Sequence, residues 1–282
     1  MLSKSDIYKK YVTDDVINRK GLLHSVKSPF YMRIKAKMIN PSKLHPNPDD
    51  EFSMENIGPN WEIIANYEKN IKINLMKSGK VFEEPLAGVK LNNGEYMLLN
   101  GHHRWMAAMN LGIKKVPVSI INITSEEDIY RVVNKSSRNI CVTIDLDEVL
   151  LADKTFRFPL SALYKKNIRD NSSLLIRELH RMNFDVWVYT GSYKSEEYVR
   201  GLFFFNNSKI DGMVNGVNGG KNALKIRDIF RNKYKYIVHV DNYMLTCVNT
   251  ATKEYEIIDI DADGDKWSSA VAQQIKQLNI SV

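Results

Sequence analysis

The chain has 282 residues, of which 44% are hydrophobic, a composition typical of a folded globular protein. It has two cysteines and no apolar run long enough to cross a bilayer, so we expect neither a disulfide framework nor a membrane-spanning helix. Its formal net charge of +7 lies mostly in the first half, because residues 1–138 carry 21 Lys and Arg against 15 Asp and Glu, while residues 139–282 carry 19 against 18.

These properties predict a two-domain protein of the cytoplasm. The length exceeds that of a typical single domain. The first residues lack the apolar segment of a secretory signal, and we expect no membrane partner. The basic first half can attract nucleic acid, nucleotides or other polyanions. A lysine-rich surface that is only solvated remains the simpler explanation of the same charge.

The first half mixes predicted helices and strands. Residues 1–30 read as a short helical extension before the first compact domain, which we place at residues 31–135. Proline-rich residues 41–48 interrupt regular structure, and residues 92–94 (Asn-Asn-Gly) form a predicted hairpin turn. Helices are predicted at residues 63–76 and 105–111, and strands at residues 31–39, 85–89, 96–99 and 116–121.

The second half alternates predicted strands and helices, which favours a parallel sheet covered by helices. A polar stretch at residues 134–137 marks the boundary, and the second domain spans residues 139–282. Strands are predicted at residues 141–144, 184–189, 212–214 and 236–240, and helices at residues 173–181, 196–202 and 222–230.

Polar side chains follow three of these predicted strands. Asp145 and Asp147 come after the first strand, Thr190 after the second and Asp241 after the last. The carboxyl ends of parallel strands meet at one edge of a sheet, where ligands of such folds bind. An isolated Asp-x-Asp is more often a surface turn, but the two downstream positions, Thr190 and Asp241, favour a phosphate and Mg²⁺ site.

This second-half pattern resembles the haloacid dehalogenase-like (HAD) phosphohydrolases over residues 139–282. Asp145-Leu146-Asp147-Glu148-Val149-Leu150 matches their first motif, and Thr190, Lys221 and Asp241 match the next three. The resemblance implies that Asp145 attacks phosphorus, that Asp147 acts as general acid and base, and that Thr190 binds a phosphoryl oxygen. Lys221, preferred over Lys225, would balance charge, and Asp145, Asp147 and Asp241 would hold Mg²⁺.

The same pattern departs from many of these relatives. Glu148 and Val149 stand where Gly and Thr are common, and Asn242 follows Asp241 where a second acid would bind a metal more strongly. The interval from Asp147 to Thr190 leaves no room for a large domain that covers the site. Relatives with open sites act on bulky phosphoesters, so the substrate could be a small molecule, a nucleotide or a nucleic-acid end.

A second candidate site lies in the first half, where Asn100-Gly101-His102-His103-Arg104 joins a predicted strand to a predicted helix. Gly101 lets the backbone approach a ligand, and the start of a helix attracts anions. Arg104 can bind a phosphate with two hydrogen bonds, and His102 and His103 can donate hydrogen bonds. A capped helix start with a surface salt bridge is the plainer alternative.

Residues 30–123 resemble the ParB/sulfiredoxin (ParB/Srx) fold, whose members include nucleotide-binding partition proteins, ATP-using sulfiredoxins and small-molecule kinases. The resemblance rests on Ile39-Asn40-Pro41, Pro46-Asn47-Pro48, the predicted helix at residues 63–76, Gly101-His102-His103-Arg104 and Leu111-Gly112-Ile113-Lys114-Lys115-Val116-Pro117-Val118. His102 stands where sulfiredoxins have Cys, and Asn100 where the kinases have Asp. The kinase branch implies Glu51 as general base, although a solvated acidic turn would look the same.

The sequence thus predicts an α/β protein, with an α+β ParB/Srx-like domain before a Rossmann-like HAD domain that has a parallel sheet. The leading hypothesis is a phosphotransfer enzyme. Its second domain would be a Mg²⁺-dependent phosphomonoesterase, and its first domain would bind ATP or another nucleotide, as in a kinase. The alternative is a nucleotide-gated nucleic-acid-binding protein with an associated HAD-like domain. A third hypothesis is an interaction protein in which both sites have lost activity.

Overall fold

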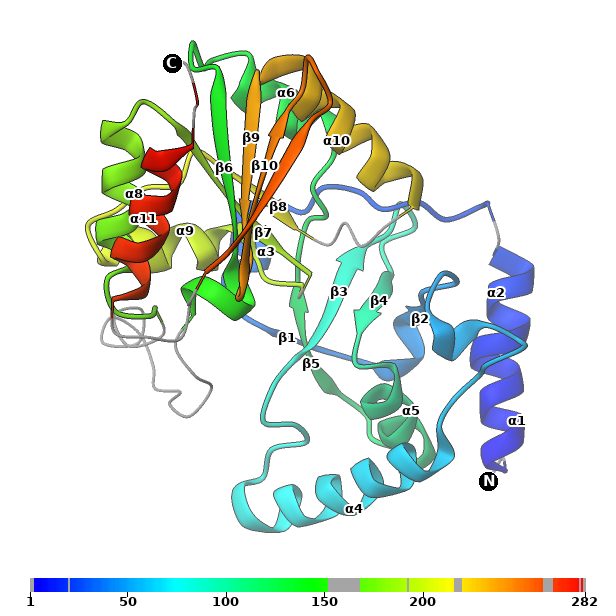
Figure 1. Ribbon diagram of the computed structural model, residues 1–282. Coiled ribbons are helices and arrows are strands. Elements are labelled where there is room, and N and C mark those ends of the chain that lie inside the picture. Colours follow the sequence, from blue (N-terminus) through cyan, green and yellow to red (C-terminus); the bar gives the residue numbers. More distant parts are fainter. Residues whose placement is uncertain are drawn as a thin grey trace. The chain divides into compact units, whose positions relative to one another are not determined.

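The computed structural model describes residues 3–19, 21–151, 168–191, 193–215, 220–260, 266–278 and 280, and for residues 220–223 it describes the backbone alone. The chain forms two compact units, the N-terminal unit Met1–Asn122 and the C-terminal unit Ile123–Val282 (Figure 1). The sequence analysis placed the division at residues 135–139. The structure divides the chain earlier, because helix α6 (Glu126–Val133) packs against α10 (Gly220–Lys233) of the C-terminal unit.

The N-terminal unit begins with one continuous helical stretch, made of α1 (Lys4–Tyr8), η1 (Lys9–Thr13) and α2 (Asp14–Arg19) (Figure 1). Ser3 and Asp6 start it with reciprocal side-chain to backbone hydrogen bonds, which satisfy two N–H groups at the helix start. Val12 is fully buried and anchors the stretch to the core of this unit.

The sheet of the N-terminal unit has the strand order β1-β5-β3-β4-β2. Strands β3 and β4 pair antiparallel, and Gly94 takes a left-handed backbone (φ 86°) in the predicted turn between them. Strand β1 pairs antiparallel with β5, whereas the pairs β3–β5 and β2–β4 are parallel. The strands are β1 (Lys37–Ile39), β2 (Leu44–Pro46), β3 (Leu86–Lys90), β4 (Tyr96–Asn100) and β5 (Val116–Ile120).

The strand predicted at residues 31–39 is wrong over its first half. The structure has one helical turn there, α3 (Phe30–Arg33), and the strand begins only at Lys37. Pro29 precedes α3 in an extended conformation, as proline does at a helix start. Apolar residues alternate along the whole stretch, but only Ile39 among residues 30–39 is buried. The stretch therefore lacks the buried face that sustains a strand.

Helices α4 (Trp61–Ser78) and α5 (His102–Asn110) pack against each other in the N-terminal unit. Trp105 of α5 is fully buried, and its indole N–H donates to the Pro41 carbonyl oxygen at 2.9 Å. Two short turns, η2 (Pro41–Lys43) and η3 (Glu51–Ser53), flank β2 in the sequence. The proline-rich segment is thus fixed to α5 and forms part of the core.

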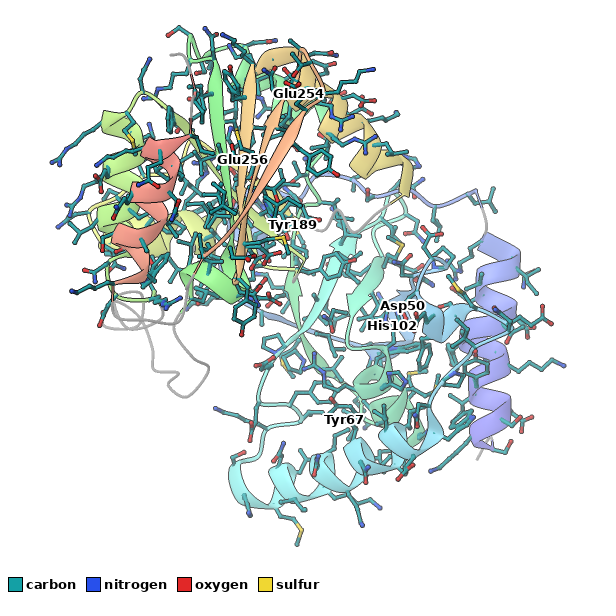
Figure 2. All side chains as sticks on the ribbon, viewed as in Figure 1. Asp50, Tyr67, His102, Tyr189, Glu254 and Glu256 are labelled. Carbon is teal, nitrogen blue, oxygen red and sulfur yellow. The ribbon has the colours of Figure 1, made fainter. Side chains whose placement is uncertain are left out.

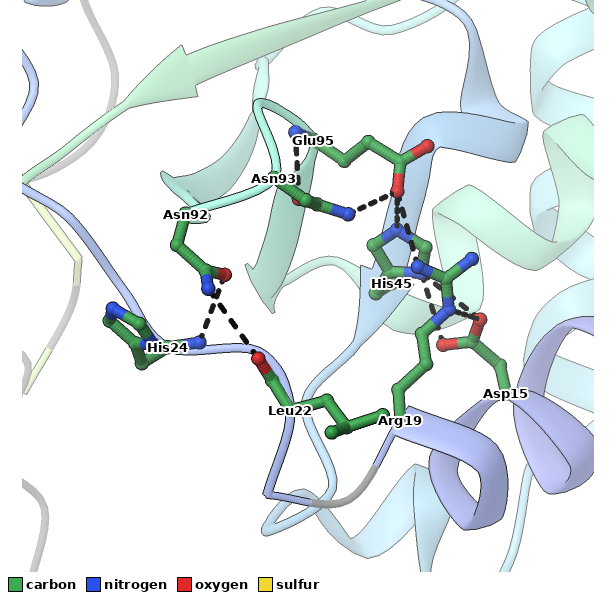
Figure 3. Close-up of polar contacts among 8 residues, drawn as sticks. All are labelled: Asp15, Arg19, Leu22, His24, His45, Asn92, Asn93 and Glu95. Carbon is green, nitrogen blue, oxygen red and sulfur yellow. Dashed lines mark hydrogen bonds and ion pairs between the residues drawn. The ribbon is translucent and has the colours of Figure 1, made fainter.

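A partly buried ionic cluster holds the end of α2 against the sheet (Figure 3). His45 of β2 lies between two carboxylates, with Nδ1 3.0 Å from Asp15 Oδ2 and Nε2 2.9 Å from Glu95 Oε2. Arg19 bridges the same carboxylates, at 2.7 Å from Asp15 and 3.2 Å from Glu95. Asn93 donates a further hydrogen bond to Glu95. The cluster joins three segments that lie far apart in the sequence.

The C-terminal unit has a six-stranded sheet in the order β11-β10-β9-β6-β7-β8. The strands are β6 (Ile140–Asp145), β7 (Asp185–Thr190), β8 (Gly212–Asn215), β9 (Tyr236–Val240), β10 (Met244–Asn249) and β11 (Tyr255–Asp259). The four predicted strands, β6 to β9, are present and run parallel to one another. Strands β10 and β11 are antiparallel, so the sheet is mixed and not the purely parallel one expected.

Helices cover both faces of this sheet (Figure 1). One face carries α8 (Ser172–Arg181), α9 (Glu196–Phe205) and α11 (Trp267–Gln277) over the largest apolar core, and the other carries α6 and α10. A π-helical turn, η4 (Leu146–Leu150), follows β6 directly. Within the part of the chain that the structure describes, we find no helix with the length and apolarity needed to span a membrane.

Candidate functional site

The first candidate site is the turn at Gly101, which joins β4 to α5. Gly101 has a left-handed backbone (φ 95°), a conformation that favours glycine. A Cβ atom at this position would lie 2.6 Å from Leu86 Cδ2 and 3.0 Å from Arg104 Nη2. Glycine is therefore required twice, once for the backbone angle and once for the space. The second distance shows that the Arg104 guanidinium folds back over the turn.

Arg104 is fixed in that position by its surroundings. Its Nη1 donates to the Glu84 carbonyl oxygen at 2.8 Å, and the guanidinium carbon lies 5.8 Å from the centre of the Phe82 ring. Burial lowers the pKa of Arg104, and the charge of Tyr67 on α4 opposes this shift. Arginine stays protonated despite such a shift. A permanent cation is thus held over the start of α5, where no side chain caps the helix.

His102 is buried and holds the loop after β2 in place. Its Nε2 accepts a hydrogen bond from the Asn47 backbone N–H at 3.2 Å, so this nitrogen carries a lone pair and the ring is neutral. Its Nδ1 lies 3.3 Å from Asp50 Oδ2 (Figure 2). Burial lowers the pKa of His102 to about 4, although the Asp50 carboxylate acts to raise it. The ring is an uncharged anchor at neutral pH.

His103 holds the start of α4 in a similar way. Its Nε2 accepts from the Asn60 backbone N–H at 3.1 Å, and burial lowers its pKa. Phe52 packs between the two rings, stacked on His102 at 5.5 Å and edge-on to His103 at 5.1 Å between ring centres. The Nε2 atoms of both histidines are therefore occupied by hydrogen bonds from backbone N–H groups. Among the motif side chains, Arg104 is the one that suits an anion.

The loop carboxylate beside His102 is Asp50, whereas the sequence analysis favoured its neighbour Glu51. Asp50 also caps η3, since its Oδ1 accepts from the Phe52 N–H at 3.0 Å. Glu51 and Asn100 are both exposed, at the start of η3 and the end of β4. An acid placed as the cap of a short turn is the signal that could have pointed to Asp50.

The second candidate site lies at the carboxyl ends of β6 and β7. Asp145 ends β6, and its Oδ1 accepts from the Glu148 N–H at 2.7 Å. Burial raises the pKa of Asp145, and the charges of Asp147 and Asp241 add to this, while backbone hydrogen bonds oppose it. Asp147 and Asp241 therefore each lie near enough to Asp145 to interact with it electrostatically.

Asp147 is held by two donors from the segment at the end of β7. Thr190 donates its hydroxyl to Asp147 Oδ2 at 2.6 Å, and the Lys194 ammonium lies 2.6 Å from Asp147 Oδ1. The sequence analysis expected Asp147 and Thr190 at one site but missed Lys194. Its position before Ser195, which caps α9, was the available signal. Lys221, which the sequence analysis preferred, begins α10, and its side chain lies outside the described residues.

The donor set does not present a ready metal site. Asp241 directly follows β9, and its Oδ1 accepts a hydrogen bond from the Asn242 N–H at 2.8 Å. Asp145 and Asp147 already accept the hydrogen bonds described above. Over the described residues, no three His, Cys, Asp or Glu side chains are grouped so that they could hold a metal ion. Mg²⁺ remains a prediction from the resemblance, and we derive no step through it.

Comparisons with known proteins support the first half of the resemblance. The sequence model of the ParB N-terminal domain matches residues 32–136, which contain the Gly101 turn. One similar solved structure is the C-terminally truncated chromosome-partitioning protein ParB from Caulobacter crescentus complexed with CTP-gamma-S. It is 21% identical, with a TM-score of 0.25, and the match covers 37% of this chain and 56% of that chain.

The comparisons cover only part of this chain. This chain spans little more than half the length of that partitioning protein's chain. A search of curated proteins gives no match. Residues 32–136 thus match the sequence model of the ParB N-terminal domain, and neither comparison supports the HAD-like part of the resemblance, which stays a prediction.

Proposed function

We propose that the N-terminal unit binds a nucleotide by its phosphates at the Gly101 turn. The observation that supports this most directly is the Arg104 guanidinium held over Gly101, where a Cβ atom would come within 3.0 Å of Nη2. A fixed cation and the uncapped N–H groups of a helix start favour the same anionic ligand. The match to the ParB N-terminal domain over residues 32–136 supports the same conclusion.

The test is binding of fluorescent ribonucleoside triphosphates to the full chain, with all four bases, because the site recognises phosphates. Arg104→Met should weaken the tightest of them by at least about tenfold, the scale of a lost charge-assisted pair. Arg131→Met is the control, since Arg131 lies exposed on α6 beside Asp128. Equal affinities for the wild type and Arg104→Met would contradict the proposal.

We further propose that the protein binds nucleic acid and that the bound nucleotide changes the affinity for it. Between Asp15 and Asp49 the chain has no acidic residue and seven Lys or Arg residues, a bias that suits a polyanion. Binding to labelled DNA and RNA should weaken steeply with added salt and should change when nucleotide is present. Binding that is insensitive to both would rule this partner out.

A second candidate function, phosphomonoester hydrolysis in the C-terminal unit, is favoured by the contact of Asp147 with Thr190. Asp145 would attack phosphorus while the ester P–O bond breaks and the leaving oxygen takes a proton from Asp147. Water would then attack the acyl phosphate, give a proton back to Asp147 and release inorganic phosphate from Asp145. The raised pKa of Asp145 fits a carboxylate whose charge is costly until it bonds phosphorus.

The hydrolysis is tested by phosphate release from an aryl phosphate and from 3′- or 5′-phosphorylated oligonucleotides. Asp145→Asn should abolish release, whereas Asp228→Asn, an exposed acid of α10, should not change it. Release that survives Asp145→Asn would show that another group attacks phosphorus. ATP with candidate acceptors, in the same assay, tests the kinase activity that the sequence resemblance implies for the N-terminal unit.

A further inference from the structure

In the C-terminal unit, Lys194 forms an ion pair with Asp147, one of the two acids of the Asp145-x-Asp147 motif. Its ammonium lies 2.6 Å from Asp147 Oδ1, and both side chains are about three-quarters buried, at 26% and 29% exposed. Lys194 lies between the end of β7 and the start of α9, and residues 193–195 belong to no helix or strand. Contacts with other segments therefore help to fix its backbone.

Asn215 supplies that restraint from the neighbouring strand. It ends β8, where it pairs with Thr190 of β7, and it is only 2% exposed. Its side-chain Nδ2 donates a short hydrogen bond to the Lys194 carbonyl oxygen. Its backbone N–H donates to Thr124 Oγ1 at 2.9 Å, which fixes the end of β8 in turn. Together these contacts form a closed path from Asp147 through Thr190, Asn215 and Lys194 back to Asp147.

The side-chain oxygen of Asn215, Oδ1, makes an unfavourable contribution to the free energy of folding. Asn215 Oδ1 is buried and has no hydrogen-bond partner among the described residues. An unsatisfied buried polar atom is unfavourable, and an apolar residue of the same size would avoid it. Among the described residues, the Asn215 amide is therefore satisfied only at Nδ2, by its hydrogen bond to the Lys194 carbonyl oxygen.

We propose that Asn215 is a positioning residue, which holds the Lys194 backbone so that the Lys194 ammonium reaches Asp147. The proposal rests on the second candidate function for its role in chemistry. There the Asp147 carboxyl group acts on the leaving oxygen, and the Lys194 ammonium beside it would help to fix its position. The geometric claim itself stands whether or not the protein hydrolyses phosphoesters.

The test follows the titration of Asp147 by NMR in the full chain with carbon-13-labelled Asp side chains, with Asp147→Asn used to assign the signal. Lys194→Met should raise the measured pKa of Asp147 by about one unit, because a nearby cation favours the charged carboxylate. Asn215→Leu, which keeps the volume and removes the donor, should raise it by a large part of that amount. Asn215→Ser, which is too short to reach Lys194, should act in the same direction.

Asn206→Leu is the matched control, because the Asn206 amide donates to the Leu202 carbonyl oxygen at the far end of α9. It should leave the titration of Asp147 unchanged. The inference would be overturned if the measured pKa of Asp147 is the same in the wild type and in a folded Asn215 variant. The hydrolysis proposal fails by a separate result, which is the absence of Asp145-dependent phosphate release from the wild type. That result is independent of the NMR titration.

Discussion

At the scale of single residues, Gly101 and Gly94 offer a matched pair. Both have left-handed backbones (φ 95° and 86°), but a Cβ atom meets Leu86 at Gly101 and has open space at Gly94. Gly94→Ala should destabilise the protein by about 1 kcal/mol through the backbone alone. Gly101→Ala should cost roughly 1–3 kcal/mol more through the overlap. Urea denaturation measures both, and equal losses would contradict the close packing at Gly101.

The neutral His102 ring predicts a loss of stability in mild acid. Its folded pKa of about 4 lies below the ordinary value of 6.5, so the unfolded chain binds the proton more readily between these values. Stability should therefore fall as the pH drops from 6.5 towards 4, by roughly 3 kcal/mol from this group.

His102→Gln separates this contribution from the rest of the chain. The Gln amide can still accept a hydrogen bond from the Asn47 N–H but does not titrate, so the stability of this variant should depend less on pH between 6.5 and 4. His24→Gln, which changes an exposed ring, is the control. Unfolding free energies measured by denaturant titration at several pH values decide the matter. If the stability of His102→Gln depends on pH as strongly as that of the wild type, a group other than His102 takes up the proton.

At the scale of elements, the ionic cluster at His45 should govern how firmly α2 is attached. Asp15→Asn leaves the buried His45 ring with one carboxylate in place of two, so protection of the α1–α2 amides against hydrogen exchange should drop by on the order of 1–3 kcal/mol. Lys4→Met, which breaks an ion pair at the exposed start of the same stretch, should change it by less than about 1 kcal/mol. Equal effects would show that the cluster does not anchor α2.

Acid should weaken the same cluster. Burial acts to raise the pKa of Glu95, but the hydrogen bond and charge of His45 outweigh it and hold that pKa below the usual 4.5. A depressed carboxyl pKa stabilises the fold above 4.5, and this stability is lost as the pH falls through the folded value. The hydrogen exchange measurement on α1–α2 should therefore show faster opening below pH 4.5.

Local sequence signals predicted the elements whose cause is local. The Asn92-Asn93-Gly94 turn and the strands beside it were foreseen because Gly94 supplies a left-handed backbone where the hairpin needs one. Strands β10 and β11 were missed. Residues on β11 such as Tyr255 and Ile257 are exposed, so its pattern lacks the buried face that marks a strand. Pairing with β10 alone determines its conformation.

The candidate sites show the same limit. Asp145, Asp147 and Thr190 were predictable as neighbours, because strand ends of a parallel sheet meet at one edge. Asp50, Lys194 and Asn215 were missed, because each joins its site through a contact between segments far apart in the sequence. For Asp50 and Lys194 only a nearby helix or turn cap gave a local signal, and for Asn215 there was none.

At the scale of the whole molecule, the chain joins an N-terminal unit, most of which matches the sequence model of the ParB N-terminal domain, to a unit with a mixed six-stranded sheet. Each unit carries one candidate site, and each site lies where a strand ends and a helical turn begins. The two proposed functions have one ligand chemistry in common, because each involves phosphate oxygens.

The central claim is that phosphate binds at the Gly101 turn, and phosphorus NMR of a non-hydrolysable triphosphate titrated into the full chain tests it most directly. The account predicts phosphate resonances that shift on binding to the wild type and to Asp145→Asn alike, and that stay at their unbound positions with Arg104→Met. Shifts that persist in Arg104→Met but vanish in Asp145→Asn would contradict it, because they would place the phosphates in the C-terminal unit.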